Sequence, residues 1–298
     1  MKKGEIFMKQ YLACGYLVVV FVSGVFASNG PLRRTGSIDG HVEIANLVVE
    51  KYMLPGYKVD GGAWQRLEMP ENLAGNAQAI SGDGRVICGL IHERDSYAPI
   101  DSYVARASVW YNDNTTLQEP VFRLLDLPLL AGAHYSSALD ISENGRYTIG
   151  FCQEQPLVGE QACYWDVYGV HSLGTITYDS FLADSTYPHS VSNDNIIVGT
   201  ALGSDNSYQL AFIWDQIHGM RYLKDVLETE YGYNFSGCTL SQAYNISPDG
   251  RIIDGYGYNQ QGDYFDWVVT IPEPASLLLL GLGGLFLRRK AGCGGVKL

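Results

Sequence analysis

The five tryptophans constrain the fold of this chain more than any other feature, because they recur at a nearly constant interval. They are spaced 46, 55, 49 and 53 residues apart. Self-similarity with a period of roughly 20 to 50 residues is typical of solenoids, propellers and other repeat arrays. We therefore predict one structural unit per tryptophan. The tryptophans are Trp64, Trp110, Trp165, Trp214 and Trp267.

A second signature recurs four times between the tryptophans, at Ser81, Ser142, Ser192 and Ser247. Each serine is followed two residues later by Asp or Asn, and three of the four copies continue with Gly and Arg. Asp-Gly and Asn-Gly accept the positive φ of a tight turn, and the β-branched residues around them favour strands. The signature predicts a β-hairpin in every unit. Its turn glycines are Gly84, Gly145 and Gly250.

The tryptophan segments also pair with the residues directly after them, as at residues 213–223, where Asp215 and Gly219 bound a turn. Each unit then offers about four strands in about 50 residues, as one propeller blade does, and such sheets bury their faces against their neighbours. We predict an all-β repeat domain over residues 63–271, a small propeller of four or five blades. A tryptophan is expected at an equivalent buried position of each blade.

The last tryptophan opens a strand, residues 266–271, that has no hairpin of its own. The N-terminal segment, residues 28–62, contains one candidate strand near Val42–Val49. We expect these two strands to pair and close the ring, because closure removes exposed sheet edges.

Several short groups of residues in the third and fourth units share a further pattern. They are Leu173-Gly174-Thr175, Val191-Ser192-Asn193, Val198-Gly199, Ala211-Phe212-Ile213-Trp214-Asp215 and Gly219-Met220. They resemble the HAF repeats of extracellular bacterial proteins, over roughly residues 63–271. The family's usual His before Ala-Phe is Leu210 here. The resemblance implies an extracellular repeat protein and supplies no catalytic residue.

The C-terminal region, residues 272–290, has three parts in fixed order. Pro272-Glu273-Pro274 comes first, an uncharged run of 13 residues comes next, and Arg288-Arg289-Lys290 ends it. Two prolines mark an exposed joint, since they continue neither a helix nor a central strand. As a helix the run would rise about 20 Å, which is short for a hydrocarbon core of roughly 30 Å. We predict a short transmembrane sorting helix, with the basic cluster and residues 291–298 in the cytoplasm.

This order of features resembles the PEP-CTERM sorting signal of bacteria, a tail also found on some ice-binding proteins. The resemblance implies recognition by an exosortase-type membrane enzyme and processing near Pro272-Glu273-Pro274. It also implies transient anchoring in the inner membrane and delivery to the cell surface or extracellular matrix. The tail is an address, so it is no sign of ice binding.

The N-terminus has the three-part layout of a secretory signal peptide. Lysines at positions 2, 3 and 9 precede an apolar run over residues 11–26. We expect residues 1–27 to be removed by cleavage between Ala27 and Ser28. Both Met1 and Met8 are possible starts.

Charge excludes one class of partner. Without residues 1–27 and 288–298 the chain keeps 13 basic and 31 acidic residues, a net charge of −18. A body this acidic repels phosphate backbones and anionic lipids. We therefore expect neither nucleic acid nor an anionic membrane surface as a partner of the body.

The exported part retains four cysteines, Cys88, Cys152, Cys163 and Cys238. An oxidising compartment favours disulfides, and four thiols allow three pairings. Cys152 and Cys163 flank one short connection and are the expected pair, with buried free thiols as the alternative. No spacing indicates a metal site or a cofactor.

No motif indicates catalysis. The six histidines are scattered, and HExxH, GxSxG and a glycine-rich phosphate loop are absent from the sequence. Acidic segments such as residues 81–84 lack the ligands of a calcium loop and indicate turns. We expect a non-enzymatic, surface-sorted β-repeat protein of the cell envelope or exopolysaccharide matrix. The alternative is a carbohydrate-binding protein or carbohydrate-active enzyme on the same scaffold, with polysaccharide as partner.

Overall fold

The computed structural model describes residues 12–13, 16–17, 35–38, 40–49, 52–93, 105–114, 119–154, 159–178, 181–203 and 208–272. The chain divides into two compact units, Met1–Gly30 and Pro31–Leu298. In the first unit β1 (Leu12–Ala13) and β2 (Tyr16–Leu17) pair antiparallel. The cleavage site at Ala27 and Ser28 lies outside the described residues, as do Glu273, Pro274, Arg288, Arg289, Lys290 and the tail at 291–298.

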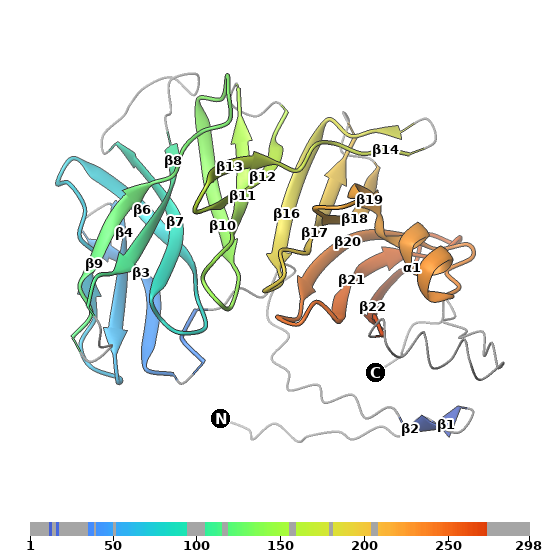
Figure 1. Cartoon of the computed structure of the whole chain (residues 1–298), viewed down its shortest axis with the longest axis horizontal. Helices are drawn as coiled ribbons and strands as arrows, with labels where there is room; N and C mark the ends of the chain where they lie inside the picture. Colours follow the sequence, from blue (N-terminus) through green and yellow to red (C-terminus); the bar gives the residue numbers. More distant parts are fainter. Residues whose placement is uncertain are drawn as a thin grey trace. The chain divides into compact units, whose positions relative to one another are not determined.

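Five antiparallel sheets succeed one another along the second unit (Figure 1). The first sheet contains β3 (Val42–Val49), β4 (Tyr52–Val59) and β5 (Gln65–Arg66), and the second contains β6 (Leu73–Ile80), β7 (Val86–Glu93), β8 (Ala105–Asn112) and β9 (Phe122–Asp126). The third contains β10 (Tyr135–Ile141), β11 (Thr148–Gln153), β12 (Gln161–Asp166) and β13 (Gly169–Ser172), and the fourth β16 (Ser185–Val191), β17 (Ile197–Leu202), β18 (Gln209–Asp215) and β19 (Gly219–Tyr222). The last sheet contains β20 (Thr239–Ile246), β21 (Ile252–Tyr258) and β22 (Tyr264–Thr270). The predicted all-β class is confirmed.

Two smaller elements connect the later sheets. A hairpin of β14 (Thr177–Tyr178) and β15 (Phe181–Leu182) comes after the third sheet. Helix α1 (Leu223–Tyr231) comes after β19 and buries Leu223, Val226 and Leu227, then ends at Gly232 with φ 69°. No helix within the described residues is long and apolar enough to cross a membrane.

The repeated serine signature turns the first strand of each of the last four sheets into the second. Gly84, Gly145 and Gly250 have φ values of 72°, 70° and 73°, and Asn195 takes this place in the fourth sheet with φ 60°. The hydroxyl of Ser81 donates to the Asp83 side chain two residues later, at 2.6 Å. Serine hydroxyls of the signature also accept the backbone N–H that opens the second strand. Each turn is therefore closed by its own side chains.

These turns also bond to one another, sheet after sheet. The N–H of Ile38 donates to the carbonyl of Gly82, and the N–H of Gly82 donates to that of Glu143, at 2.8 and 2.7 Å. The Asn193 side chain then accepts from the N–H of Asn144, and the N–H of Asn193 donates to the carbonyl of Pro248, both at 2.8 Å. We call this edge, where the signature turns lie, the turn end of the sheets, and the opposite edge the loop end.

A β-bulge in the first strand of the second, third, fourth and last sheets lies opposite a glycine of the second strand. A Cβ on Gly150 would lie 1.9 Å from the carbonyl oxygen of Ser137, and the other three positions give 2.0 to 2.1 Å. Only glycine fits so close an approach of backbone. The glycines that end each apolar stretch are therefore required by packing. They are Gly89, Gly150, Gly199 and Gly255.

Each sheet packs on the next, and four apolar clusters fill the spaces between them. The predicted closure of the ring is wrong. Strand β22 pairs with β21 and completes a sheet of its own, while β3 pairs with β4. The last tryptophan does have a hairpin in its sheet, formed by β20 and β21 over residues 239–258. This hairpin comes before Trp267 in the sequence, because the strand that holds Trp267 is the third of the sheet.

The five tryptophans are not equivalent. Trp110, Trp165 and Trp214 are buried opposite Ile87, Thr148 and Ile197, two residues before the close-approach glycine. Trp267 is buried opposite the glycine itself, Gly255, so it is shifted by two residues.

Trp64 is 41 % exposed, and the Lys58 ammonium lies 4.9 Å from its ring centroid. The indole N–H of Trp110 donates to the carbonyl of Glu68, in the connection that enters its sheet from the preceding one. Trp165 donates to the carbonyl of Pro128 in the same way. The first of the five sheets has no such sheet before it, so Trp64 has no equivalent packing site and the prediction for it is wrong.

The predicted cysteine pair is brought together without forming a disulfide. The Cys152 and Cys163 sulfurs lie 3.6 Å apart, against about 2.05 Å for a bond, and both thiols are free and buried. Burial raises the pKa of Cys163 well above its usual value. Cys88 is also buried.

Candidate ligand-binding surface

Strand register identifies equivalent positions in successive sheets. One residue after each close-approach glycine, the second strand pairs with an alanine in three sheets: Leu90 with Ala107, Phe151 with Ala162 and Thr200 with Ala211. These alanines are fully buried and face the following sheet. In the last sheet the equivalent pair is Tyr256 with Asp266, and Asp266 is exposed.

The neighbouring position changes in the same way. The residue before the glycine is Cys88, Ile149 or Val198 in the second to fourth sheets, each buried against the next sheet. In the last sheet it is Asp254, whose pKa is raised by burial and held back by a hydrogen bond from Asn245. The face that binds a following sheet elsewhere is therefore polar in the last sheet.

Three tyrosines lie on this face, because Tyr256 and Tyr258 of β21 pair with Asp266 and Tyr264 of β22. Tyr244 at the bulge of β20 joins them, and its ring also lies 6.0 Å from that of His189 in β16. Tyr256 lies at the centre, with ring centroids 5.5 Å from Tyr244, 5.8 Å from Tyr258 and 5.2 Å from Tyr264. Tyr258 and Tyr264 are 41 % and 53 % exposed. We call these four residues the tyrosine cluster.

Polar groups surround the tyrosine cluster. The Tyr264 hydroxyl donates to the carboxylate of Asp266. Gln209 Oε1 accepts from the Tyr256 hydroxyl at 3.2 Å and from the Gln242 amide at 2.8 Å. Burial, followed by the neighbouring tyrosines, raises the pKa of Tyr256 to about 12. The Tyr256 hydroxyl is thus uncharged at neutral pH, and the cluster stands beside amides and a carboxylate.

A second aromatic group lies between the third and fourth sheets and is less exposed. Phe151 stacks on Tyr135 at 5.9 Å and meets Tyr187 edge-on at 5.5 Å. Glu160 accepts from the hydroxyl of Ser185 at 2.7 Å, and burial followed by Glu160 raises the pKa of Tyr187. All three rings are half-buried, so this group stabilises the interface between two sheets more than it offers a surface.

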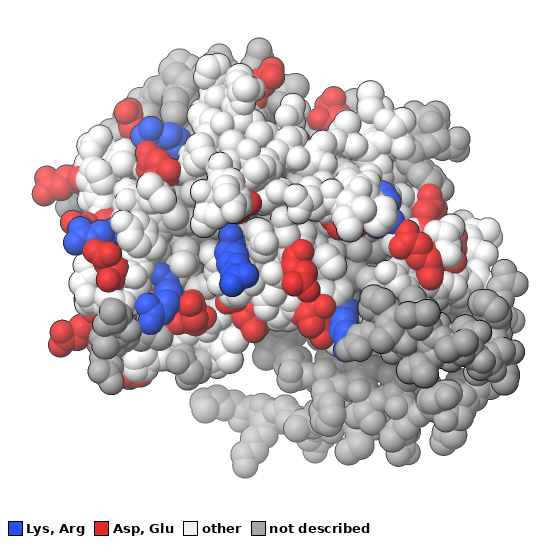
Figure 2. All heavy atoms as spheres, in the orientation of Figure 1, with Lys and Arg blue, Asp and Glu red and all other residues white. Residues whose placement is uncertain are grey.

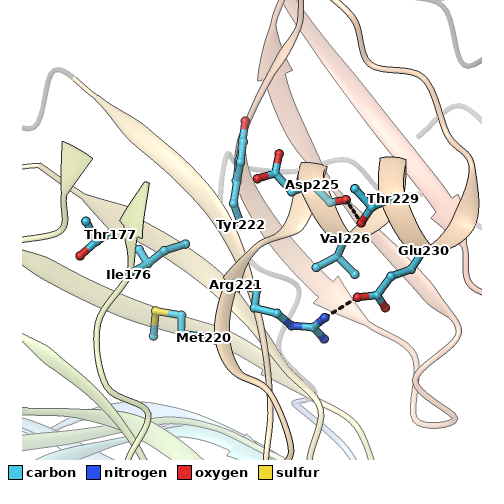
Figure 3. Close-up of a pocket in the computed structure, with 9 residues that line it drawn as sticks. All are labelled: Ile176, Thr177, Met220, Arg221, Tyr222, Asp225, Val226, Thr229 and Glu230. Carbon is cyan, nitrogen blue, oxygen red and sulfur yellow. Dashed lines mark hydrogen bonds and ion pairs between the residues drawn. The ribbon is translucent and has the colours of Figure 1, made fainter. Parts of the chain in front are cut away.

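A cavity of about 330 Å³ lies beside α1 (Figure 3). It is lined by Arg221, Asp225, Val226, Thr229 and Glu230 among others. Arg221 donates to Asp215 at 2.8 Å and to Glu230 at 2.5 Å. Because two carboxylates already neutralise this guanidinium, the cavity has little capacity to attract an anion.

Charge does not concentrate at one place on the face shown in Figure 2. Acidic and basic side chains are interspersed there, and the coloured residues form no broad basic patch. Within the described part of the chain no group of three His, Cys, Asp or Glu side chains could hold a metal ion.

The residues predicted as sites fall into two sets. The four buried tryptophans and the turn glycines are structural, whereas Trp64 is exposed. Pro272 of the sorting motif comes two residues after the end of β22. Sequence reasoning missed the tyrosine cluster. The available signal was the loss of the apolar pattern in the last unit, where Asp254 and Asp266 replace buried residues and Tyr-Gly-Tyr stands at residues 256–258.

The comparisons give one specific match. Residues 270–290 match the PEP-CTERM protein-sorting motif, which confirms the predicted signal. No curated protein matches. The likeness to HAF repeats stays a prediction.

Solved structures show distant likenesses to this chain. A putative TolB from Agrobacterium tumefaciens is 16 % identical with a TM-score of 0.44, over 80 % of this chain and 73 % of that one. TolB from Acinetobacter baumannii is 13 % identical with a TM-score of 0.45, over 81 % and 54 %. An oligogalacturonate lyase in complex with manganese is 9 % identical with a TM-score of 0.43, over 78 % and 75 %. These likenesses are too distant to indicate a function.

Proposed function

We propose that this chain is an exported protein, processed by an exosortase-type membrane enzyme and sorted to the cell surface or extracellular matrix. Its five-sheet body acts there as a non-catalytic binding module. The sorting motif at residues 270–290 carries this proposal. The predicted signal peptide at residues 1–27 and a short membrane-spanning segment within residues 272–290 complete it.

The joint between body and signal supports processing of a folded protein. The N–H of Ile271 donates to the carbonyl of Arg251 at 2.7 Å, next to the last signature turn. Pro272 is the next residue, so Pro272-Glu273-Pro274 comes directly after the last strand bond. An enzyme that grips this joint needs to unfold no part of a sheet.

We propose further that the five sheets are blades of a propeller-like array that remains open. Pro248 is the last member of the bonded turns and has no N–H to pass on, which suits a unit with no successor. The polar outer face of the last sheet supports the same conclusion, because terminal repeats need a polar outer face for solubility.

We propose carbohydrate as the ligand class of the body, and the tyrosine cluster is the observation that supports this choice. We propose binding without cleavage. The carboxylates of Asp254 and Asp266 already accept from Asn245 and from Tyr264.

Replacing Pro272-Glu273-Pro274 with three alanines tests the sorting proposal. The variant should stay in the inner membrane unprocessed, whereas the parent should reach the surface fraction with a mature start near Ser28 by mass spectrometry. Replacing the exposed pair Val167-Tyr168 with alanines is the control and should change nothing. Unaltered release of the proline variant would contradict the proposal.

A further inference from the structure

The outer face of the last sheet is a surface and not a vacant sheet interface. Interfaces between the sheets are built from small and apolar residues, as at Val198, Ala211 and Ile213 of the fourth sheet. The equivalent residues of the last sheet are Asp254, Asp266 and Val268. Two carboxylates opposite another sheet would lose their hydration without gaining a partner.

What the face presents is the chemistry of sugar recognition. Exposed rings stack on the apolar C–H faces of pyranoses, while carboxylates and amides bond the hydroxyls around the ring. Tyr258 and Tyr264 supply exposed rings, and Tyr256 contacts both of them from within the cluster. Asp266 and Gln242 of the last sheet supply acceptors and donors beside them, and Gln209 of β18 in the fourth sheet bonds to Gln242 and Tyr256.

Charge selects among sugars. The carboxylates of the face are Asp254 and Asp266, and the body that carries them has a net charge of −18 between residues 28 and 287. No lysine or arginine is among the described residues of β20, β21 and β22. An anionic polysaccharide would be repelled, whereas a neutral one would not.

The location suits a ligand outside the cell. Tyr258 and Tyr264 pair at the loop end of the last sheet, while β22 runs to the turn end, where the sorting signal begins. Six steps of about 3.4 Å separate Tyr264 from Thr270 at the other end of β22, a distance of about 20 Å. The exposed rings therefore lie at the end of the strand farthest from the membrane attachment.

We propose that the tyrosine cluster, with Asp266, Gln242 and Gln209, is a binding site for a neutral polysaccharide chain. This inference rests on the proposed function and names the ligand and the residues of the binding module. Tyr258 and Tyr264 stack on the sugar rings, and Asp266 orients Tyr264 and accepts a sugar hydroxyl.

Affinity electrophoresis of the processed protein tests this proposal. Native gels contain hydroxyethyl cellulose, laminarin, galactomannan or dextran, and a parallel gel contains polygalacturonate as the anionic probe. We expect retardation by at least one neutral polymer and none by polygalacturonate. Y258A/Y264A should weaken the retardation at least about ten-fold, and Y258F/Y264F should weaken it much less, because the rings remain although Tyr264 loses its bond to Asp266.

Tyr168→Ala, which removes a tyrosine that is 88 % exposed elsewhere, is the matched control and should bind as the parent does. Thermal melting establishes that each variant is folded, and Tyr264→Ala alone replaces the double variant if that one melts early. Retardation by no neutral polymer, or undiminished retardation of Y258A/Y264A, would overturn the site. Surface fractionation of the same strains tests the sorting proposal separately. The sorting proposal and the polysaccharide site can therefore each be contradicted without the other.

Discussion

The fourth and last sheets share one signature and one strand register, yet they differ wherever a neighbour on the far side matters. The fourth sheet buries Ala211 and Val198 against the last sheet, which places Asp266 and Asp254 at the same positions. At the turn end, the backbone N–H of Asn193 donates to the carbonyl of Pro248, while Pro248 has no N–H and can only accept. The difference teaches that position in the array, and not the repeat itself, decides these residues.

Exchanging equivalent residues between the two sheets should give the largest difference in the free energy of unfolding. Ala211→Asp puts a carboxylate into a fully buried interface, and we expect the free energy of unfolding to fall by about 4–5 kcal/mol. The reciprocal change, Asp266→Ala, should alter the free energy of unfolding by less than about 1 kcal/mol because the site is exposed. Urea denaturation measures both, and similar effects of the two changes would contradict an open end.

The tryptophans give the second test. Trp165 is buried and donates to the carbonyl of Pro128 at 2.7 Å, so Trp165→Phe should cost about 2–3 kcal/mol by leaving both a cavity and an unpaired carbonyl.

Trp267 occupies the position that Phe212 fills in the fourth sheet, and its indole N–H has no partner among the described residues. Trp267→Phe should therefore cost less, about 1 kcal/mol. Equal losses on urea denaturation would show that the shifted register of Trp267 has no energetic meaning.

Sequence reasoning recovered the repeat but not its ends. The turns at Gly84, Gly145 and Gly250 are set by local chemistry, since positive φ depends on a few adjacent residues. The pairing of β22 depends on which strands lie beside it in space, and a period of about 50 residues does not reveal that the last tryptophan is shifted by two. The same period predicted a buried position for Trp64, and it does not reveal that the first sheet lacks a preceding sheet to bury it.

The candidate site was missed because four tyrosines from three strands are dispersed over residues 244–264. Only the register of β20, β21 and β22 brings the outer three rings within 5.2 to 5.8 Å of Tyr256. The sorting signal, by contrast, is contiguous, and the sequence was enough to identify it.

The bonded turns offer a milder test. Proline already occupies the equivalent position in the last sheet, so Asn193→Pro should fit the backbone and remove only the bonds to Asn144 and to the carbonyl of Pro248. We expect a loss of about 1–2 kcal/mol by thermal denaturation. Pro248→Asn, which supplies a donor that no later turn uses, should change stability by less than about 0.5 kcal/mol.

The smallest effect concerns pH. Burial raises the pKa of Asp254, so the folded state holds this proton more tightly than the unfolded state does. Its contribution to stability is present at pH values below the unfolded pKa and is lost as pH rises through the folded pKa. Asp254→Asn should therefore raise the melting temperature slightly at pH 7 and leave it unchanged near pH 3. A lower melting temperature at pH 7 would show that the carboxylate is favoured where it stands.

The direction of the bonded turns bears on how such a chain lengthens by duplication. Each turn before the last donates a backbone N–H to the turn that follows it. A copied unit inserted between two existing sheets would therefore have a donor on one side and an acceptor on the other. A copy added after the last sheet would meet Pro248, which lacks the N–H that Gly82 and Asn193 donate, and a sheet face bearing two carboxylates. Growth at that terminus would require three substitutions at once, so the number of sheets is expected to vary among descendants by internal insertion, with the final unit inherited unchanged.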